Sequence, residues 1–153
     1  MVLISHRGNI NGKNVELENQ PSYIDDAIKL GYNVEIDVWY IDNKLYLGHD
    51  SADYQIDIDW IKSRLGKLWI HCKNLPAIEY LHNNTDVMVR GYGNYFFHNT
   101  DDTTITSKGY LWVYPGKQPI KNSISVLPEI HNDDISQCYG ICSDIIKQYK
   151  NVT

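Results

Sequence analysis

Residues 32–40, YNVEIDVWY, alternate apolar and polar side chains. This period of two predicts a β-strand with Glu35 and Asp37 on one face, because alternate side chains of a strand point the same way. Two adjacent carboxylates repel each other, so they persist mainly where a cation or a hydrogen-bond network compensates. A second apolar run, residues 45–47, leads into the Gly-His-Asp sequence at 48–50. Carboxylates followed by a histidine suggest a functional site.

A strand, a helix and a second strand are predicted over the first 38 residues. The apolar run 2–4 reads as a strand buried on both faces, and it ends in Ser-His-Arg-Gly. After a turn-rich loop, Asn19 is the expected cap of a helix, Pro21 suits its first turn and Gly31 ends it. The order strand, helix, strand is typical of a right-handed parallel crossover.

The same pattern continues with shorter segments. A helix over 58–65, with Asp57 and Asp59 capping or flanking it, precedes a strand at 68–70 and a helix at 76–83. A terminal helix is expected to run through Tyr149. Between these helices the sequence predicts short strands at 87–89, 95–97, 110–114, 124–127 and 140–142.

Polar and ionisable residues follow nearly every predicted strand at its C-terminal end. In parallel α/β folds, sites are built at that edge of the sheet. The sequence therefore predicts a barrel-like α/β fold with a convergent polar pocket, and no linker divides residues 1–153, so we expect one domain. The residues at these strand ends are His6, Arg7, Glu35, Asp37, His71, Lys73, His98, Glu129 and Asp144.

Composition narrows the classes of protein. The 153 residues carry a formal charge of -5, which argues against a protein that wraps nucleic acid electrostatically. No apolar run approaches the roughly 20 residues of a membrane span, and the start lacks the features of a signal peptide. Three cysteines without zinc spacing favour a reduced, cytoplasmic setting. Trp39 and Trp112 could wall a substrate pocket, and core packing is the alternative for either of them.

Several short motifs occur in an order that resembles the glycerophosphodiester phosphodiesterase family. The resemblance is continuous over about the first 50 residues, continues more weakly in residues 69–73, and returns in residues 140–144. The motifs that carry it are His6-Arg7-Gly8, Glu18-Asn19, Ala27, Gly31, Glu35-x-Asp37-Val38, Leu47 and His49-Asp50.

The resemblance implies a metal-dependent phosphodiesterase, a phosphoric diester hydrolase acting on a small glycerophosphodiester-like substrate, with a cyclic phosphate as an intermediate or product in many relatives. His6 and His49 would be the general acid/base pair, which suits groups that titrate near neutral pH. Arg7 and Lys73 would bind the phosphate, beside Trp39. The metal ligands would be Glu35, Asp37 and the residue at position 71.

Two departures from the family pattern matter. The family has a Glu where this chain has His71, and imidazole is a poorer ligand for the expected Mg²⁺ or Ca²⁺. Either Mn²⁺ or Zn²⁺ is preferred, or Glu129 or Asp144 completes the site, or His71 is catalytic. The chain is also shorter than the roughly 250 residues of a (β/α)₈ barrel. We therefore expect a trimmed TIM-like barrel of about seven or eight mostly parallel strands, with helices mainly in the first half.

Other assignments remain open at this level. The second half of the barrel could be closed by loops or capped by a partner subunit in a homo-oligomer. Glu129 and Asp144 could instead hold Arg7 or Lys73 in place by hydrogen bonds. His98 with Asp101 and Asp102 could be a second site or a polar turn, whereas His82 and His131 read as surface residues. The alternative function is a non-catalytic phosphate-binding module on the same pocket.

Overall fold

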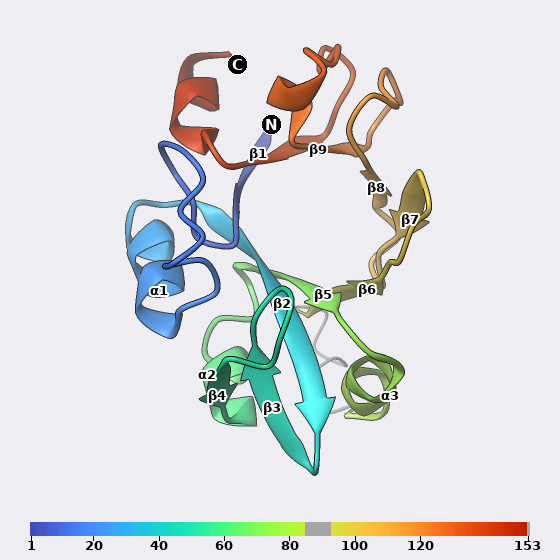
Figure 1. Ribbon diagram of the computed structural model, residues 1–153. Helices are drawn as coiled ribbons and strands as arrows, with labels where there is room; N and C mark the ends of the chain where they lie inside the picture. Colours follow the sequence, from blue (N-terminus) through green and yellow to red (C-terminus); the bar gives the residue numbers. More distant parts are fainter. Residues whose placement is uncertain (85–92, 153) are drawn as a thin grey trace.

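The computed structural model describes residues 1–84 and 93–152, and its central feature is a mixed ten-stranded sheet curled into a half-barrel (Figure 1). The expected trimmed (β/α) barrel is therefore wrong, because helices are sparse and do not alternate with the strands. The expected strand over residues 87–89 lies outside the described residues.

Seven strands form the parallel part of the sheet, in the order β6-β5-β2-β1-β10-β9-β8. The strand β1 lies between β2 and β10, so segments from the two ends of the chain meet at the first strand (Figure 1). The bounds are β1 Val2–His6, β2 Asn33–Ile41, β5 Leu68–Cys72, β6 Asn94–Phe97, β8 Leu111–Val113, β9 Ile124–Val126 and β10 Gly140–Ser143.

Antiparallel strands make up the rest of the sheet. The strand β3 (Lys44–Leu47) pairs with β2 and with β4 (Tyr54–Ile56), and β7 (Thr103–Ile105) pairs with β8. These connections are too short for a parallel crossover, which needs a dozen or more residues. Strands β4 and β7 carry no clear alternation, and the sequence analysis missed both.

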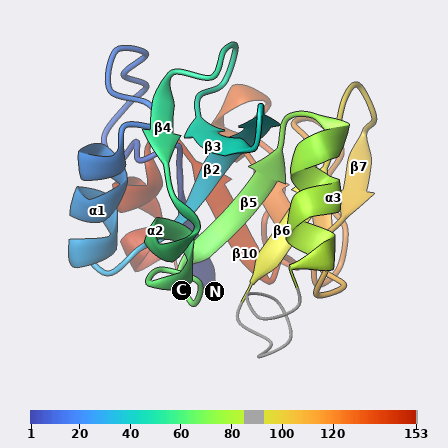
Figure 2. The same cartoon turned by 90° about the horizontal axis from the view of Figure 1, so that it is seen from below.

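The α-helices of the described residues lie between residues 21 and 83 and cover the outer face of β2 and β5 (Figure 2). They are α1 (Pro21–Lys29), α2 (Ile58–Lys62) and α3 (Leu75–Asn83). Gln20 rather than Asn19 precedes α1, whereas the carboxylate of Asp57 accepts a hydrogen bond from the Trp60 N–H and caps α2, as expected. The predicted terminal α-helix is the 3-10 helix η2 (Ile146–Asn151), and η1 (Pro128–Ile130) is a second 3-10 turn.

The two larger apolar cores lie on opposite sides of the sheet, and Tyr32, Ile141 and Ile146 form a third, small cluster. Val34, Ile36 and Val38 point outward into the larger core under the helices. The smaller core fills the inside of the curl and includes Ile4 and Trp112. Because strand side chains alternate, the residues between the outward apolar positions of β2 must point to the inside. No helix in the described part of the chain is long and apolar enough to cross a membrane.

Candidate active site

A cavity of about 520 Å³ opens at the C-terminal ends of the parallel strands, above the inner core. Both halves of the chain contribute to its walls. It is lined by His6, Arg7, Glu35, Trp39, His49, Asp50, His71, Lys73, Phe97, His98, Asn99, Trp112, Tyr114 and Val126. Every predicted catalytic and substrate-binding residue is in this set, and Asp37 lies directly beneath it against Arg7 and Lys73.

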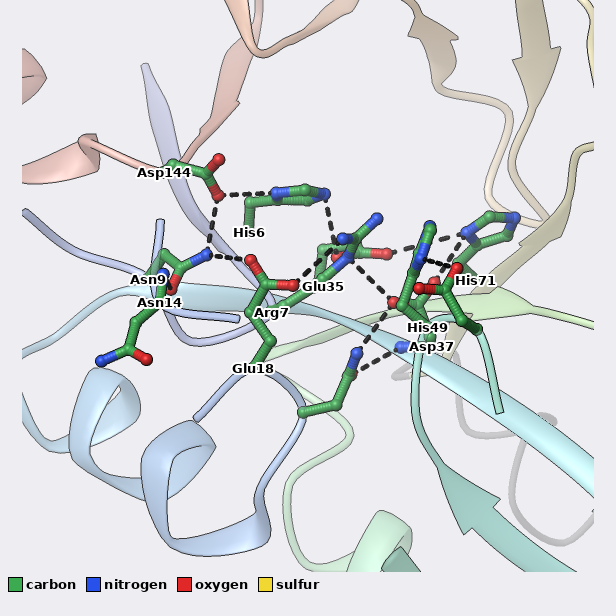
Figure 3. Close-up of polar contacts among 12 residues, drawn as sticks. His6, Arg7, Asn9, Asn14, Glu18, Glu35, Asp37, His49, His71 and Asp144 are labelled. Atoms are coloured by element: carbon green, nitrogen blue, oxygen red, sulfur yellow. Dashed lines mark hydrogen bonds and ion pairs between the residues drawn. The ribbon is translucent and has the colours of Figure 1, made fainter. Parts of the chain in front are cut away.

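Asp37 is fully buried and is the centre of a charge cluster (Figure 3). Its Oδ2 lies 3.0 Å from Arg7 Nε, and its Oδ1 lies 3.0 Å from His71 Nδ1 and 3.6 Å from Lys73 Nζ. Asn19 donates from Nδ2 to Oδ2 at 2.8 Å and accepts the Asp37 backbone N–H at 3.0 Å. Burial alone would raise the pKa of Asp37, but His71, Arg7 and Lys73 outweigh burial and lower it. Asp37 therefore stays ionised.

Glu35 has much weaker compensation than Asp37, although the two share one face of β2. The nitrogen atoms that approach its carboxylate are His71 Nδ1 at 3.8 Å and His6 Nε2 at 3.9 Å. Its buried Oε2 has no hydrogen-bond partner among the described residues. Burial, together with the charge of Asp37, raises the pKa of Glu35. A buried acceptor without a partner is costly and is typical of a position that a ligand completes.

The residues present fit a divalent cation. Glu35, Asp37 and His71 offer ligand atoms that all lie within 4.8 Å of one another. The other proposed third ligands are engaged elsewhere: Glu129 Oε1 accepts from Ser143 Oγ at 2.8 Å, and Asp144 contacts His6. Among the described residues, His71 is therefore the third member of the cluster. A donor set of two carboxylates and one imidazole suits Mn²⁺ or Zn²⁺ better than an all-oxygen site would.

His6 ends β1 and is held at one ring nitrogen. Its Nδ1 lies 2.7 Å from Asp144 Oδ1, which follows the neighbouring strand β10. The same carboxylate oxygen accepts a hydrogen bond from Asn9 Nδ2 at 2.8 Å. This contact places the Nδ1 proton against Asp144, so Nε2 faces Glu35 and the cavity. Asp144 thus holds His6, and the expectation that it holds Arg7 or Lys73 is wrong.

His49 reaches the cavity from the turn after β3. Gly48 has a φ of +150°, and a Cβ at this position would collide with the backbone oxygen of Ser51, so only glycine fits the turn. The ring Nδ1 of His49 lies 2.7 Å from Asp50 Oδ1, which again leaves Nε2 free. Partial burial and the cations Arg7 and Lys73 lower the pKa of His49. This histidine is therefore mainly neutral, and basic, at pH 7.

Arg7 sits at a left-handed backbone position, with a φ of 54°. Its Nη1 donates to Glu18 Oε2 at 3.2 Å while its Nε faces Asp37, so two carboxylates fix the guanidinium. The other oxygen of Glu18 accepts from Asn9 Nδ2 at 2.9 Å. Asn9 therefore links the support of Arg7 to the support of His6. The sequence analysis missed this linking role because an asparagine in a turn carries no signal of it.

The far wall of the cavity comes from the second half of the chain. The His98 ring stacks on Tyr114 with 3.6 Å between the ring centroids, and Trp112 is 2 % exposed in the inner core. Trp39 forms part of the cavity mouth, whereas Trp112 is mainly a core residue. Asp102 is paired with Lys117 at 3.1 Å. His82 and His131 are exposed, as expected for surface residues.

Comparison with family models, with curated proteins and with solved structures yields no match. The function of this chain is therefore inferred from the chemistry of the cavity and from the sequence motifs that contain its residues.

Proposed function

We propose that this protein is a metal-dependent phosphodiesterase that cleaves a small glycerophosphodiester-like substrate. One observation carries the proposal: two histidines with free Nε2 atoms, two cations and a buried carboxylate pair line or underlie a single cavity. The motifs shared with glycerophosphodiester phosphodiesterases supply the same residues in the same order. A site for phosphate binding alone would need the cations, but it would not need a paired acid and base.

Proton transfer is assigned to the two histidines. The lowered pKa of His49 suits it to take a proton from the attacking hydroxyl, either of water or of the substrate. As the new P–O bond forms and the bond to the leaving oxygen breaks, His6, carrying a proton on Nε2 as well as on Nδ1, donates the Nε2 proton to that oxygen. Asp144 keeps the His6 ring oriented during this transfer, since it holds Nδ1 at 2.7 Å. No protein nucleophile is required.

Arg7 and Lys73 would neutralise the negative charge of the bound phosphate. Both cations are anchored on Asp37, so neither must reorganise when an anionic substrate arrives. Glu35, Asp37 and His71 would hold the divalent ion, which supplies Lewis-acid polarisation of a phosphate oxygen when bound. The orphaned oxygen of Glu35 is the structural reason to expect an ion there.

Steady-state hydrolysis of bis(p-nitrophenyl) phosphate and of glycerophosphodiesters, in a series of Mg²⁺, Ca²⁺, Mn²⁺ and Zn²⁺, tests the proposal. His6→Ala and His49→Ala should each lower kcat by roughly 10²- to 10⁴-fold. His131→Ala, which removes an exposed histidine away from the cavity, is the matched control and should have no effect. Absence of metal-dependent turnover on every substrate would refute the enzyme assignment.

A phosphate-binding module is the second candidate, and the neutralisation of Asp37 favours it. Arg7, His71 and Lys73 already compensate this carboxylate, so the cluster does not depend on a metal for its charge balance. In that case, inorganic phosphate should raise the thermal unfolding midpoint in the presence of EDTA, without any turnover. Arg7→Gln should remove the stabilisation.

A further inference from the structure

One face of the β2–β3 hairpin continues the cavity outward. Glu35, Asp37, Trp39 and Ile41 alternate along β2, so all four side chains point to the same face of one strand. The first two lie in the metal cluster, Trp39 lines the cavity mouth, and Ile41 is 39 % exposed beyond it. The hairpin extends away from the curled sheet (Figure 1). A single strand thus leads from the reaction centre to the surface.

The neighbouring strand adds a second aromatic residue to this face. Tyr46 is paired directly with Trp39, and Lys44 is paired with Ile41. On the next strand, Gln55 is paired with Tyr46. Directly paired residues of antiparallel strands share a face and lie within side-chain contact. We call this surface the ledge: Trp39, Ile41 and Tyr46, bordered by Lys44 and Gln55.

The opposite face of the hairpin is packed, which makes the ledge rigid. Tyr40 stacks on Tyr80 of α3 with 4.3 Å between the ring centroids, and Leu45 and Leu47 are buried in the outer core. Asn74 donates to the Tyr40 carbonyl at 3.0 Å and accepts the Tyr40 N–H at 3.3 Å. The ledge is therefore preorganised and needs no ordering when a ligand binds.

The turn at the tip of the hairpin is also tight. Asp42 and Asn43 both have positive φ values, 49° and 60°, as in the two-residue type I′ turn that matches the twist of paired strands. The tip is polar, whereas a hairpin that inserts into a membrane would expose apolar residues there. The turn itself therefore adds no apolar surface to the ledge.

We propose that the ledge binds a ring-bearing substituent of the phosphodiester substrate, with the ring stacked against Tyr46 and Trp39. The Trp39 indole N–H already donates to the Gly48 carbonyl at 2.6 Å, so the indole offers its apolar ring face and not a hydrogen bond. The aromatic side chains of the paired residues Trp39 and Tyr46 can stack on a flat ring, whereas an alkyl chain gains no such stacking. This inference rests on the proposed phosphodiesterase function and names the class of substrate for the same cavity.

Three sn-glycerol phosphodiesters test the proposal, with methyl, n-hexyl or benzyl as the second substituent. Hydrolysis is followed by ³¹P NMR, so no aromatic leaving group confuses the comparison. We expect wild type to prefer the benzyl diester over the methyl diester by on the order of tenfold in kcat/KM, with n-hexyl between them. Tyr46→Ala should remove most of the preference, and Tyr46→Phe should keep it. Tyr139→Ala, a 41 % exposed tyrosine next to the start of β10, is the control and should keep it too.

The proposal that the ledge binds a ring would be contradicted if the n-hexyl diester reacted as well as the benzyl diester, or if the preference survived Tyr46→Ala. If wild type hydrolyses none of the three, the enzyme assignment fails instead. In that case, the dissociation constants of the same diesters, measured by titration calorimetry, test whether the ledge binds a ring. The benzyl diester must bind more tightly than the methyl diester, and Tyr46→Ala must abolish the difference.

Discussion

The two halves of the chain support the same cavity in different ways. In residues 1–84, strands of up to nine residues are backed by three α-helices and a large outer core. In residues 93–152, strands have three or four residues and are accompanied by 3-10 turns. The two catalytic histidines, the phosphate-binding residues and the metal cluster all come from the first half, whereas the second half supplies an aromatic wall and Asp144. The reactive groups thus lie on strands that have packed apolar side chains on both faces of the sheet.

The halves are joined at two places in the sheet: β5 pairs with β6, and β1 pairs with β2 on one side and with β10 on the other. His6 ends this shared strand and contacts Glu35 from one neighbour and Asp144 from the other. The first half therefore holds the charged cluster, and the second half completes the cavity wall and orients His6 through Asp144. Four comparisons of variants test this division. They follow in order of decreasing expected effect on the free energy of unfolding.

The largest expected effect is that of Asp37→Asn, which leaves Arg7 and Lys73 without their shared buried carboxylate. We expect the free energy of unfolding to fall by about 3–5 kcal/mol. Asp144→Asn, in the second half, should cost about 1–2 kcal/mol, because Asp144 is partly exposed and mainly orients His6. Urea denaturation of both variants at pH 7 measures the difference. Equal losses would show that the two halves bear the cluster equally.

Ile36→Ala and Ile124→Ala compare the outer core with the inner core. Both side chains are fully buried, so each substitution should cost about 2–5 kcal/mol. Because strand pairing joins the halves at β1–β10 and at β5–β6, we expect each variant to unfold in a single transition, with intrinsic fluorescence and circular dichroism giving the same midpoint. Two separate transitions, only one of them shifted by each substitution, would instead show that the halves unfold independently.

Glu35→Gln tests whether the first half is destabilised without a metal. A carboxyl whose folded pKa is raised favours folding while protonated, so stability is full below its ordinary pKa and falls as pH rises through the raised value. In EDTA at pH 8, Glu35→Gln should therefore be more stable than wild type by about 1–3 kcal/mol. Added Mn²⁺ should stabilise wild type and not the variant.

The matched control for this experiment is Glu79→Gln, which neutralises an exposed glutamate on α3. Its stability in EDTA should follow that of wild type across the same pH range. A destabilised Glu35→Gln at pH 8 would contradict the assignment of an uncompensated carboxylate at this position.

The smallest expected effect is at the cap of α2. Asp57→Ala removes the carboxylate that accepts the Trp60 N–H at 2.8 Å, and it should cost about 1 kcal/mol. Asp59→Ala, two residues further on, makes no capping bond and should cost only a few tenths of a kcal/mol. Thermal unfolding followed by circular dichroism resolves this difference. Similar losses would mean that helix-dipole charge, and not the cap, stabilises α2.

Local patterns predicted the first half well. The alternation over β2 placed Glu35 and Asp37 on one inward face, and Asp57 was recognised as the cap of a helix. Asn19 shows the limit of such patterns. It was expected to cap α1, yet it binds Asp37 through two hydrogen bonds, because its left-handed φ of 63° turns the side chain inward. Nothing in a single asparagine distinguishes these two uses.

The amino-acid sequence by itself determined most of the strands, which residues of β2 share a face, and the chemistry of the strand ends, since these follow from a period of two and from residue type. Only the tertiary structure decided the mixed half-barrel, because pairing depends on which distant segments meet. It also decided the partners of the carboxylates: Arg7 Nε and Lys73 Nζ lie 3.0 and 3.6 Å from Asp37, whereas the nitrogens that approach Glu35 belong to two histidines at 3.8 and 3.9 Å. Burial makes that difference large, since charges interact strongly only where water is excluded.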